Sequence, residues 1–468
     1  MTLVTPPTSG TLPEPSTVGT RRDWRRRLPF FYGWLIVASA FVTLGITYTV
    51  WYSFSVFYVA LLQEFGWGRA VSAGVFSLHV VFGGLAGILT GSLVDRFGPT
   101  KVVSAGALVM VAGLVACSQM TDLGQFYLYY GIVCAAGIGG TGWVPCVTMI
   151  SRWFSLRLGT AIGIASSGIG VGILIMVPVS QMMIGQFGWR TAYLVLAGIM
   201  FVGILPMSLL VMRGNPAELG LLRDGRAASP IGEDSLRGAA EAQRARIVDH
   251  KWAGTPWTVG IATRTRRYWM LFLTMALANV TTQMIMVHQV AFLVDGGFDK
   301  MLAASIVGLV GMFSIISKAS WGWVSDRLGR EITWSLGLSN TIIAIALLIS
   351  TRYLSVPVVV YFYSLFFAFG YGATAPLTPA VSADLFAGRR FGSIYGTLGV
   401  ANGLGSAIGS WLAGYIFDVT GSYLPAFAVG GAAAIASIAA MWAIAPRMIR
   451  LVPGRCPKCP SPSPAPQQ

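Results

Sequence analysis

The sequence predicts an all-α polytopic membrane protein with twelve transmembrane helices in two six-helix bundles. Of its 468 residues, 55% are hydrophobic and only 10% are charged, and the mean hydropathy is +0.69. A soluble domain carries about 25% charged residues. Twelve stretches contain the roughly 20 mostly apolar residues that a membrane span needs. Two pairs of motifs also recur in the two halves of the chain at nearly constant spacing.

The first apolar run begins near Phe30, and we expect it to stay in the protein as the first helix. The residues before it, beginning MTLVTPPTSG, lack the apolar centre of a cleavable signal peptide. The expected spans are 30–60, 71–91, 101–120, 125–150, 159–184, 191–212, 268–294, 301–321, 332–350, 357–382, 393–417 and 424–446.

The distribution of positive charge predicts the orientation. With the N-terminus placed inside, 27 of the 32 Lys and Arg residues fall in inside segments, four fall in outside segments, and Lys318 falls within a span. This asymmetry predicts a multi-pass protein of the cell (inner) membrane with both termini in the cytoplasm. It also accounts for the net charge of +15 without a nucleic-acid partner, so we expect none.

The polar segments predict the domain organisation. A charged linker, residues 213–267, separates a bundle of residues 29–212 from a bundle of residues 268–446. The terminal segments 1–28 and 447–468 are expected to be disordered cytoplasmic tails. The tail motif CPKC has no second cysteine pair to complete a zinc site, so we expect no metal and no cofactor.

Two motifs in the first half have counterparts in the second. GSLVDRFGPTKVV begins at Gly91 and GWVSDRLGREITW at Gly322, which is 231 residues later. RLGTAIGIASSGIGVG, which contains Gly159, matches RFGSIYGTLGVANGLG, which contains Gly392, at a spacing of 233 residues. The chain therefore reads as a duplicated six-helix unit, as in transporters whose two halves rock around a central site.

GSLVDRFGPTK and GWVSDRLGRE resemble the cytoplasmic loop signature of the major facilitator superfamily and its second-half copy. SRWFSLRLGTAIGIASSGIGVG, FYGWLIVASAF and EFGWGRAVSAGVFSL resemble the helix entries of the monocarboxylate transporter and oxalate–formate antiporter branches. The resemblance covers all twelve spans. It implies a secondary transporter, not an enzyme, with a small organic anion and the bilayer as partners. Proton coupling stays open, and we expect a monomer.

The duplicated motif places charges at the inner ends of two helices, where they can pair with the neighbouring bundle in one state and separate in the other. The alternative is that these residues are ordinary interfacial anchors. The expected gating residues are Gly91, Asp95, Arg96, Arg152, Gly322, Asp326 and Arg327.

Lys318 lies eight residues before Asp326, so it is about 12 Å from that helix end and near the middle of the membrane. It is either a lysine that reaches back toward the surface or a binding residue. The resemblance favours binding, because KASWG matches the place where the family carries a substrate-binding arginine. No carboxylate lies within a span to neutralise Lys318. One turn before the cation, where the family often carries an acidic or amide residue, this chain has Ser314. The expected counter-ion is the substrate.

Further residues at mid-span are candidates for substrate contact. For each of them, helix packing is about as good an explanation. His288 could carry a proton, because histidine changes charge near neutral pH, or could be structural. The expected substrate-binding set is Lys318, Tyr52, Trp143, His288, Tyr371 and Asn402.

The absence of Lys and Arg from the eleventh span favours a monocarboxylate over a dicarboxylate, because oxalate antiporters of the family use a second cation there. An oxalate or dicarboxylate exchanger and an efflux transporter of a neutral or aromatic compound remain alternatives. A membrane-embedded enzyme is disfavoured, because the three histidines are far apart in sequence. A receptor built on a transporter fold is disfavoured because the linker carries no recognisable domain.

Overall fold

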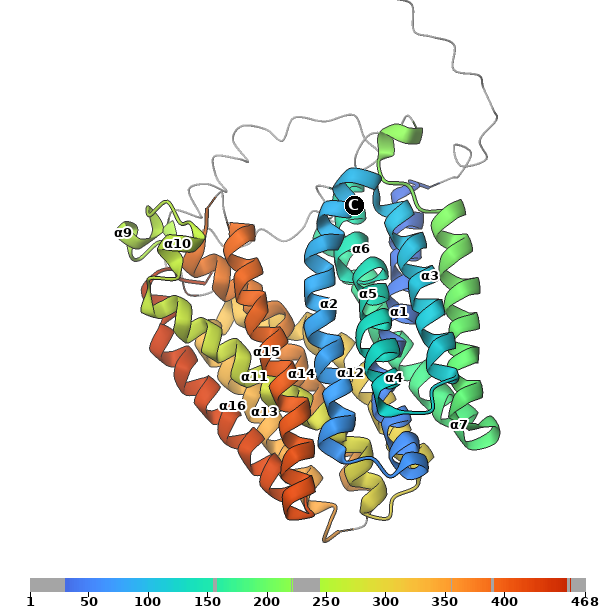
Figure 1. The fold of residues 1–468 in the computed structure, drawn as a ribbon. Coiled ribbons are helices and arrows are strands. Elements are labelled where there is room, and N and C mark those ends of the chain that lie inside the picture. The colour runs from blue at the N-terminus through green and yellow to red at the C-terminus, as the bar shows by residue number, and fades with distance from the viewer. Residues whose placement is uncertain are drawn as a thin grey trace, which may run out of the picture.

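The computed structural model describes residues 30–154, 158–219, 221, 245–354, 356–388, 391–452 and 455. The expected disordered tail 1–28 and most of residues 447–468, including both cysteines of CPKC, lie outside them. The described chain is almost entirely helical (Figure 1). Its long elements are α1 (Gly33–Phe65), α2 (Arg69–Phe97), α3 (Pro99–Ser118), α7 (Leu158–Leu210), α11 (Arg266–Asp295), α12 (Lys300–Leu328), α13 (Arg330–Ser350), α14 (Pro357–Phe386), α15 (Phe391–Thr420) and α16 (Leu424–Ile444).

The fourth span is assembled from several short pieces. They are α4 (Leu123–Phe126), the π-helical η2 (Tyr127–Cys134), α5 (Ala135–Thr141) and α6 (Trp143–Trp153). The structure interrupts this span at Gly142, whose φ and ψ of −82° and −143° are not helical. Residues on either side of Gly142 can therefore face different neighbours.

The membrane spans agree with the twelve expected ones. Ten stretches of the described residues are long and apolar enough to cross a membrane. One of these is α7, which is broken at Gly188, where φ is +80°, and therefore supplies both the fifth and the sixth span. Counting α7 twice gives eleven spans. The glycine-rich helix α15, which is not among the ten stretches, is the twelfth. Most of the observed helices extend a few residues beyond the expected boundaries, because their polar ends continue past the apolar region.

The two halves of the sequence form two bundles, with the first half (blue to green) on the right and the second half (yellow to red) on the left in Figure 1. They touch along three helix pairs: α1 with α11, α2 with α15, and α7 with α12. We call the end where α1 begins and α16 ends the linker face. The opposite end, with the turns 66–68, 296–299 and 421–423, is the far face.

The end of the linker is attached to the second half at the linker face. Its short helices α9 (His250–Ala253) and α10 (Val259–Ala262) lie there, and Trp257 is buried against α14 and α11. Ile247 pairs with Arg450, which follows α16, and the Arg246 side chain donates to the Leu451 carbonyl at 2.7 Å. Residues 245–267 of the linker are therefore held by contacts with the bundle that follows them.

Within the first bundle, α1 and α7 approach each other through glycines. A Cβ atom on Gly45 would lie 2.8 Å from the Gly168 carbonyl oxygen, and one on Gly172 would collide with the Gly45 carbonyl oxygen. Small residues at such crossings let helix backbones come into direct contact in a membrane. This packing fixes the position of α1, which carries Tyr52 toward the second half.

We predict that Gly172→Val lowers the thermal unfolding midpoint of the purified protein, because the added side chain pushes α7 away from α1. Overpacking of this kind costs about 1–3 kcal/mol. Gly163→Val is the matched control, since a Cβ there meets nothing within 4 Å. Equal midpoints for the two variants would show that the α1–α7 contact is not this tight.

Candidate functional site

Three of the expected substrate-binding residues come together at mid-depth from three helices. Lys318 on α12 places its Nζ atom 5.0 Å from the centre of the Tyr371 ring on α14. The Tyr371 hydroxyl lies 2.5 Å from the hydroxyl of Tyr52 on α1. Tyr52 belongs to the first half and the other two belong to the second. This group, the Lys318 cluster, therefore joins the two bundles.

The close contact of α12 and α14 positions Lys318 over Tyr371. A Cβ atom on Gly372 would collide with the Ser317 side chain, so the two helices touch where the cluster sits. One helical turn away, the indole Nε1 of Trp321 donates to the Phe369 carbonyl at 2.7 Å. These two contacts fix the rotation of both helices, and with it the direction of the Lys318 and Tyr371 side chains.

Lys318 is half-buried, and no described carboxylate lies within ion-pair distance of it. The Ser314 hydroxyl, one turn earlier, donates to the Gly311 carbonyl at 2.7 Å instead. The face of the Tyr371 ring supplies a cation–π contact, which offsets part of the cost of burying an ammonium. A partly buried cation with no anionic neighbour is favourably placed to bind an anion.

The structure places Trp143 and Asn402 on other elements. Trp143 begins α6 directly after the break at Gly142, and its side chain is 42% exposed. Asn402 on α15 accepts a hydrogen bond of 2.8 Å from Asn279 on α11. Neither makes a recorded contact with the Lys318 cluster, so their part in substrate binding remains a prediction.

Sequence reasoning missed two amides on α11. Asn279 binds Asn402, and Gln283, one turn further along, has a buried Oε1 atom without a hydrogen-bond partner among the described residues. The signal was present, because two amides four residues apart on an apolar helix mark one polar face. These residues extend the polar surface of the second half beyond Lys318.

His288 lies apart from the Lys318 cluster, close to the far face. Its Nε2 donates to the Ser410 carbonyl at 2.8 Å, so in the neutral ring Nδ1 accepts from the Tyr423 hydroxyl at 3.0 Å. The Tyr423 oxygen in turn accepts from the Arg69 guanidinium at 2.7 Å. Both ring nitrogens therefore have structural partners, and proton carriage by His288 remains a prediction.

Arg69, at the start of α2, is the centre of a network that joins the two halves at the far face. Its guanidinium pairs with Asp295 on α11 at 2.7 Å, and its backbone N–H, with that of Ala70, donates to the Asp418 carboxylate of α15 at 2.9 and 2.7 Å. Asp418 thus caps the N-terminus of a helix in the other half, where a negative charge is favourable. We call these residues, with Tyr423, the Arg69 network.

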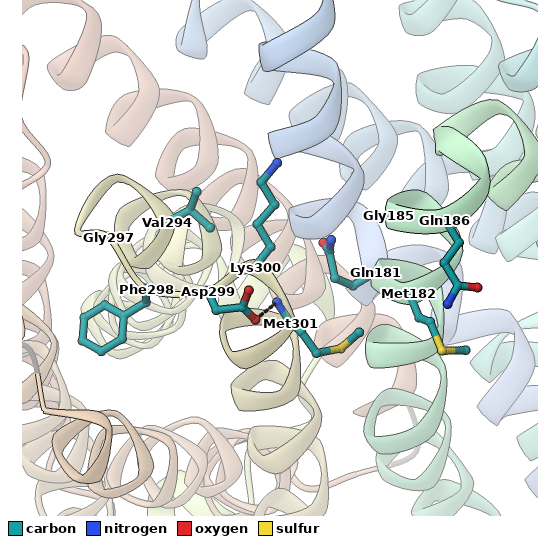
Figure 2. Close-up of a pocket in the computed structure, with 10 residues that line it drawn as sticks. All are labelled: Gln181, Met182, Gly185, Gln186, Val294, Gly297, Phe298, Asp299, Lys300 and Met301. Carbon is teal, nitrogen blue, oxygen red and sulfur yellow. Dashed lines mark hydrogen bonds between the residues drawn. The ribbon is translucent and has the colours of Figure 1, made fainter.

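A cavity of about 540 Å³ opens at the far face between α7 and the turn that joins α11 to α12 (Figure 2). Residues 181–186 of α7 form one wall, and the turn between α11 and α12 forms the other. Lys300 in that turn donates to Gln63 of α1 at 2.7 Å. Lys318 lies 18 residues further along α12, so it is about 27 Å away along the helix. The cavity is therefore separate from the Lys318 cluster.

The expected gating residues of the second half are paired within that half. Asp326 binds Arg330 at 2.9 Å, and Arg330 binds Asp384 of α14 at 2.8 Å. The Arg327 guanidinium lies 3.8 Å from the centre of the Trp323 ring, and Gly322 lies on the same helix.

In the first half, Gly91, Asp95 and Arg96 lie near the linker end of α2, and Arg152 lies near the end of α6. The Arg96 guanidinium lies 5.2 Å from the centre of the Phe97 ring. The side chain of Asp95 lies outside the described part of the structure. Gating by these residues and their second-half counterparts remains a prediction.

The contacts between the halves show which end is closed. Every hydrogen bond and ion pair between described residues of the two halves lies at Tyr52–Tyr371 or nearer the far face. In Figure 1, α2 and α15 lie closer together at the lower, far end than at the upper, linker end. The described structure is therefore held closed at the far face.

The chain is similar to several known transporters. The chain is 26% identical over 410 residues to monocarboxylate transporter 13 of Rattus norvegicus, covering 86% of each chain. It is 22% identical over 421 residues to monocarboxylate transporter 2 of Homo sapiens, covering 88% of this chain and 84% of the relative.

Two solved structures share the fold. One is the peptide transporter POT, with a TM-score of 0.68, 16% identity, and coverage of 89% of this chain and 95% of that one. The other is a bacterial homologue of the human lysosomal transporter Spinster, with a TM-score of 0.63, 16% identity, and coverage of 89% and 96%. The model of the Major Facilitator Superfamily matches residues 40–377 and, in a second overlapping match, residues 321–457. The chain therefore belongs to the Major Facilitator Superfamily.

Proposed function

We propose that this secondary transporter moves a small organic anion, a monocarboxylate, across the cell membrane by alternating access, with Lys318 binding the carboxylate. One observation carries the proposal. Lys318 lies half-buried at mid-depth against Tyr371, without a described carboxylate partner, and Tyr371 is hydrogen-bonded to the other half. An anion at this point neutralises the lysine and contacts both bundles.

The two tyrosine hydroxyls support binding of a carboxylate. In the Tyr52–Tyr371 hydrogen bond, one hydroxyl donates and the other accepts. The accepting hydroxyl keeps its own proton, which can be donated to a substrate oxygen. One carboxylate could then accept from Lys318 through one oxygen and from a tyrosine through the other. Such charge-assisted hydrogen bonds are stronger than neutral ones.

A single charge on the substrate is favoured by the composition of α15. This helix, residues 391–420, contains no Lys or Arg that could hold a second carboxylate. The names of the relatives, which are monocarboxylate transporters, point to the same class. The alternatives are a dicarboxylate exchanger and an efflux transporter of a neutral or aromatic compound. A dicarboxylate exchanger would need Lys318 to bind oxalate or a similar anion, whereas an efflux transporter of a neutral compound would not need Lys318.

Alternating access requires a closed end that can open, and the Arg69 network supplies one. It joins α2 of the first half to α11 through an ion pair, to α15 through two hydrogen bonds and to Tyr423, in the turn before α16, through a third. In the proposed cycle these contacts break when the halves rock, and the Lys318 cluster becomes accessible from the far face. Gating by the duplicated motif would act at the linker face.

We propose that the linker face is cytoplasmic. The arginines and lysines of the inside segments that the structure describes lie at that end, among them Arg96, Lys101, Arg327 and Arg447. The beginning of α1 and the end of α7 meet there, since the Tyr32 hydroxyl donates to the Val211 carbonyl at 2.6 Å. The far face would then be exposed to the outside of the cell.

Lys318→Ala is expected to remove carboxylate uptake. Truncating one member of a buried hydrogen-bonded charge pair costs about 2–5 kcal/mol, which is roughly 30-fold or more in affinity. The measurement is counterflow of labelled lactate, pyruvate and oxalate in proteoliposomes. Lys318→Arg should retain part of the activity, because the charge remains.

The matched control is Lys251→Ala, which removes an exposed lysine from α9, outside both duplicated motifs. Normal lactate or pyruvate counterflow by Lys318→Ala would show that the lysine does not bind the substrate. Absence of counterflow for every acid tested with folded wild-type protein would favour the neutral-substrate alternative.

Arg69→Gln is expected to open the far face. The variant loses the ion pair to Asp295, so the closed arrangement is less favoured relative to one in which the halves separate at that end. The rate of labelling by a membrane-impermeant maleimide is measured in a cysteine-free background that carries Ser77→Cys, with and without Arg69→Gln. We expect the protein with Arg69→Gln to be labelled at least about tenfold faster. Ser77 lies at the interface, bonded to Ser410 of α15 at 2.8 Å.

Arg190→Gln is the matched control for this experiment. Arg190 also forms a far-face ion pair, with Glu64 at 2.7 Å, but both residues belong to the first half. Its loss should leave the labelling rate at Ser77→Cys unchanged. If Arg69→Gln and Arg190→Gln behaved alike, the Arg69 network would not be the gate.

A further inference from the structure

A second cavity, of about 310 Å³, lies at the linker face on the outer flank of the second bundle. It lies between the beginning of α11 and the end of α16, next to α9. Figure 1 shows α9 and α10 at this outer edge, on the side away from the first bundle. We call it the flank cavity, and it is lined by Trp252, Thr265, Arg266, Arg267, Met270 and Ala443.

Two arginines give the flank cavity an uncompensated positive charge. Arg267 is half-buried, with its guanidinium 4.5 Å from the centre of the Trp252 ring, and Arg266 is exposed. Neither forms an ion pair with a described carboxylate. The acid in the neighbouring turn, Asp249, instead accepts from the backbone N–H of Trp252 at 2.9 Å. Two adjacent guanidinium groups without anions form a favourable place for a phosphate.

The aromatic wall of the flank cavity is held in place by hydrogen bonds. The indole Nε1 of Trp252 donates to the Leu385 carbonyl of α14 at 2.7 Å, and that of Trp257 donates to the Trp252 carbonyl at 3.2 Å. Trp269, one turn into α11, is 55% exposed and donates to the Thr263 carbonyl at 2.8 Å. Tryptophans with a hydrogen-bonded N–H and an exposed ring are typical of the membrane–water interface. The cavity is therefore at the level of lipid headgroups.

Thr265, Met270 and Ala443 complete the lining, and the last two lie on helices that continue into the spans. Met270 lies one turn into α11, and Ala443 lies in the last turn of α16. A ligand in this cavity meets guanidinium groups and a tryptophan ring at the linker end and hydrocarbon along the two helices. A soluble anion would use only the first of these surfaces, whereas a phospholipid would use both.

We propose that the flank cavity binds an anionic phospholipid from the leaflet at the linker face. The phosphate lies against Arg266 and Arg267, and the acyl chains run along Met270 and Ala443. Basic pockets between membrane helices bind anionic headgroups in this way. Because Trp252 connects the linker to α14, the bound lipid also holds the end of the linker against the second bundle. The inference does not depend on which substrate is transported.

The test uses the full-length purified protein with phosphatidylglycerol or phosphatidylcholine added in detergent, and with inorganic phosphate alone. Lipid retained on the protein is counted by native mass spectrometry, and thermal unfolding is followed in parallel. For wild-type protein we expect phosphatidylglycerol to be retained and to raise the unfolding midpoint. For Arg266→Gln/Arg267→Gln we expect at least a tenfold weaker apparent affinity for phosphatidylglycerol.

The matched control is Lys251→Gln/Arg264→Gln, which removes the same charge from two exposed residues in the same region that do not line the cavity. It should bind phosphatidylglycerol as the wild type does. Equal losses in the two double variants would overturn the proposal in favour of diffuse attraction. Equal protection by inorganic phosphate or by phosphatidylcholine would overturn the assignment to an anionic lipid.

A further variant covers the case in which the double glutamine variant does not fold. Arg267→Lys keeps the charge but loses the planar fork that holds a phosphate through two hydrogen bonds. We expect it to fold and to bind phosphatidylglycerol several-fold more weakly than the wild type. Unchanged binding by this variant would also contradict the proposal.

Discussion

The contact between the two halves at the far face determines which end of the molecule is open, and Arg69 is at its centre. One guanidinium connects Asp295 and Tyr423, and Tyr423 connects to His288. These groups are near the aqueous boundary, where opening can hydrate them. The middle of the interface relies on the contact of Gly170 on α7 with Gly311 on α12 and on the Tyr52–Tyr371 bond, and both can separate without leaving ions unpaired in the membrane.

Lys318 is the exception to this distribution of charge. The described ion pairs lie toward the ends of helices, where water is close, whereas Lys318 lies at mid-depth with an aromatic face as its partner. An empty site of this kind is unfavourable, and an anion relieves it. The same anion would lie beside the tyrosine pair that connects the halves. Binding and rocking are therefore coupled in the proposed mechanism through one small group of side chains.

The sequence was sufficient for the number of helices and the duplicated halves, because apolar length and motif spacing determine them. It was not sufficient for side-chain partners, which depend on the rotation of each helix. Asp326 was expected to face the other bundle, yet its described partner is Arg330 four residues away. Tyr52 and Tyr371 were proposed separately, as polar residues at mid-span, and only the structure shows that their hydroxyls meet, with Gly372 packed against Ser317 beside them. Asn279 and Gln283 were missed.

Asp418 has a further consequence, because it caps a helix that belongs to the other half. When the halves part, the first amides of α2 exchange a carboxylate for water, and the carboxylate becomes hydrated as well. A hydrogen bond to a charged group exceeds its aqueous replacement by about 1.5–3 kcal/mol, and by less where water is close. A closure made at a helix end in contact with water is therefore specific in geometry, while each of its bonds has a ready replacement in water. The far-face closure can therefore be released by water, which replaces each partner as the halves part.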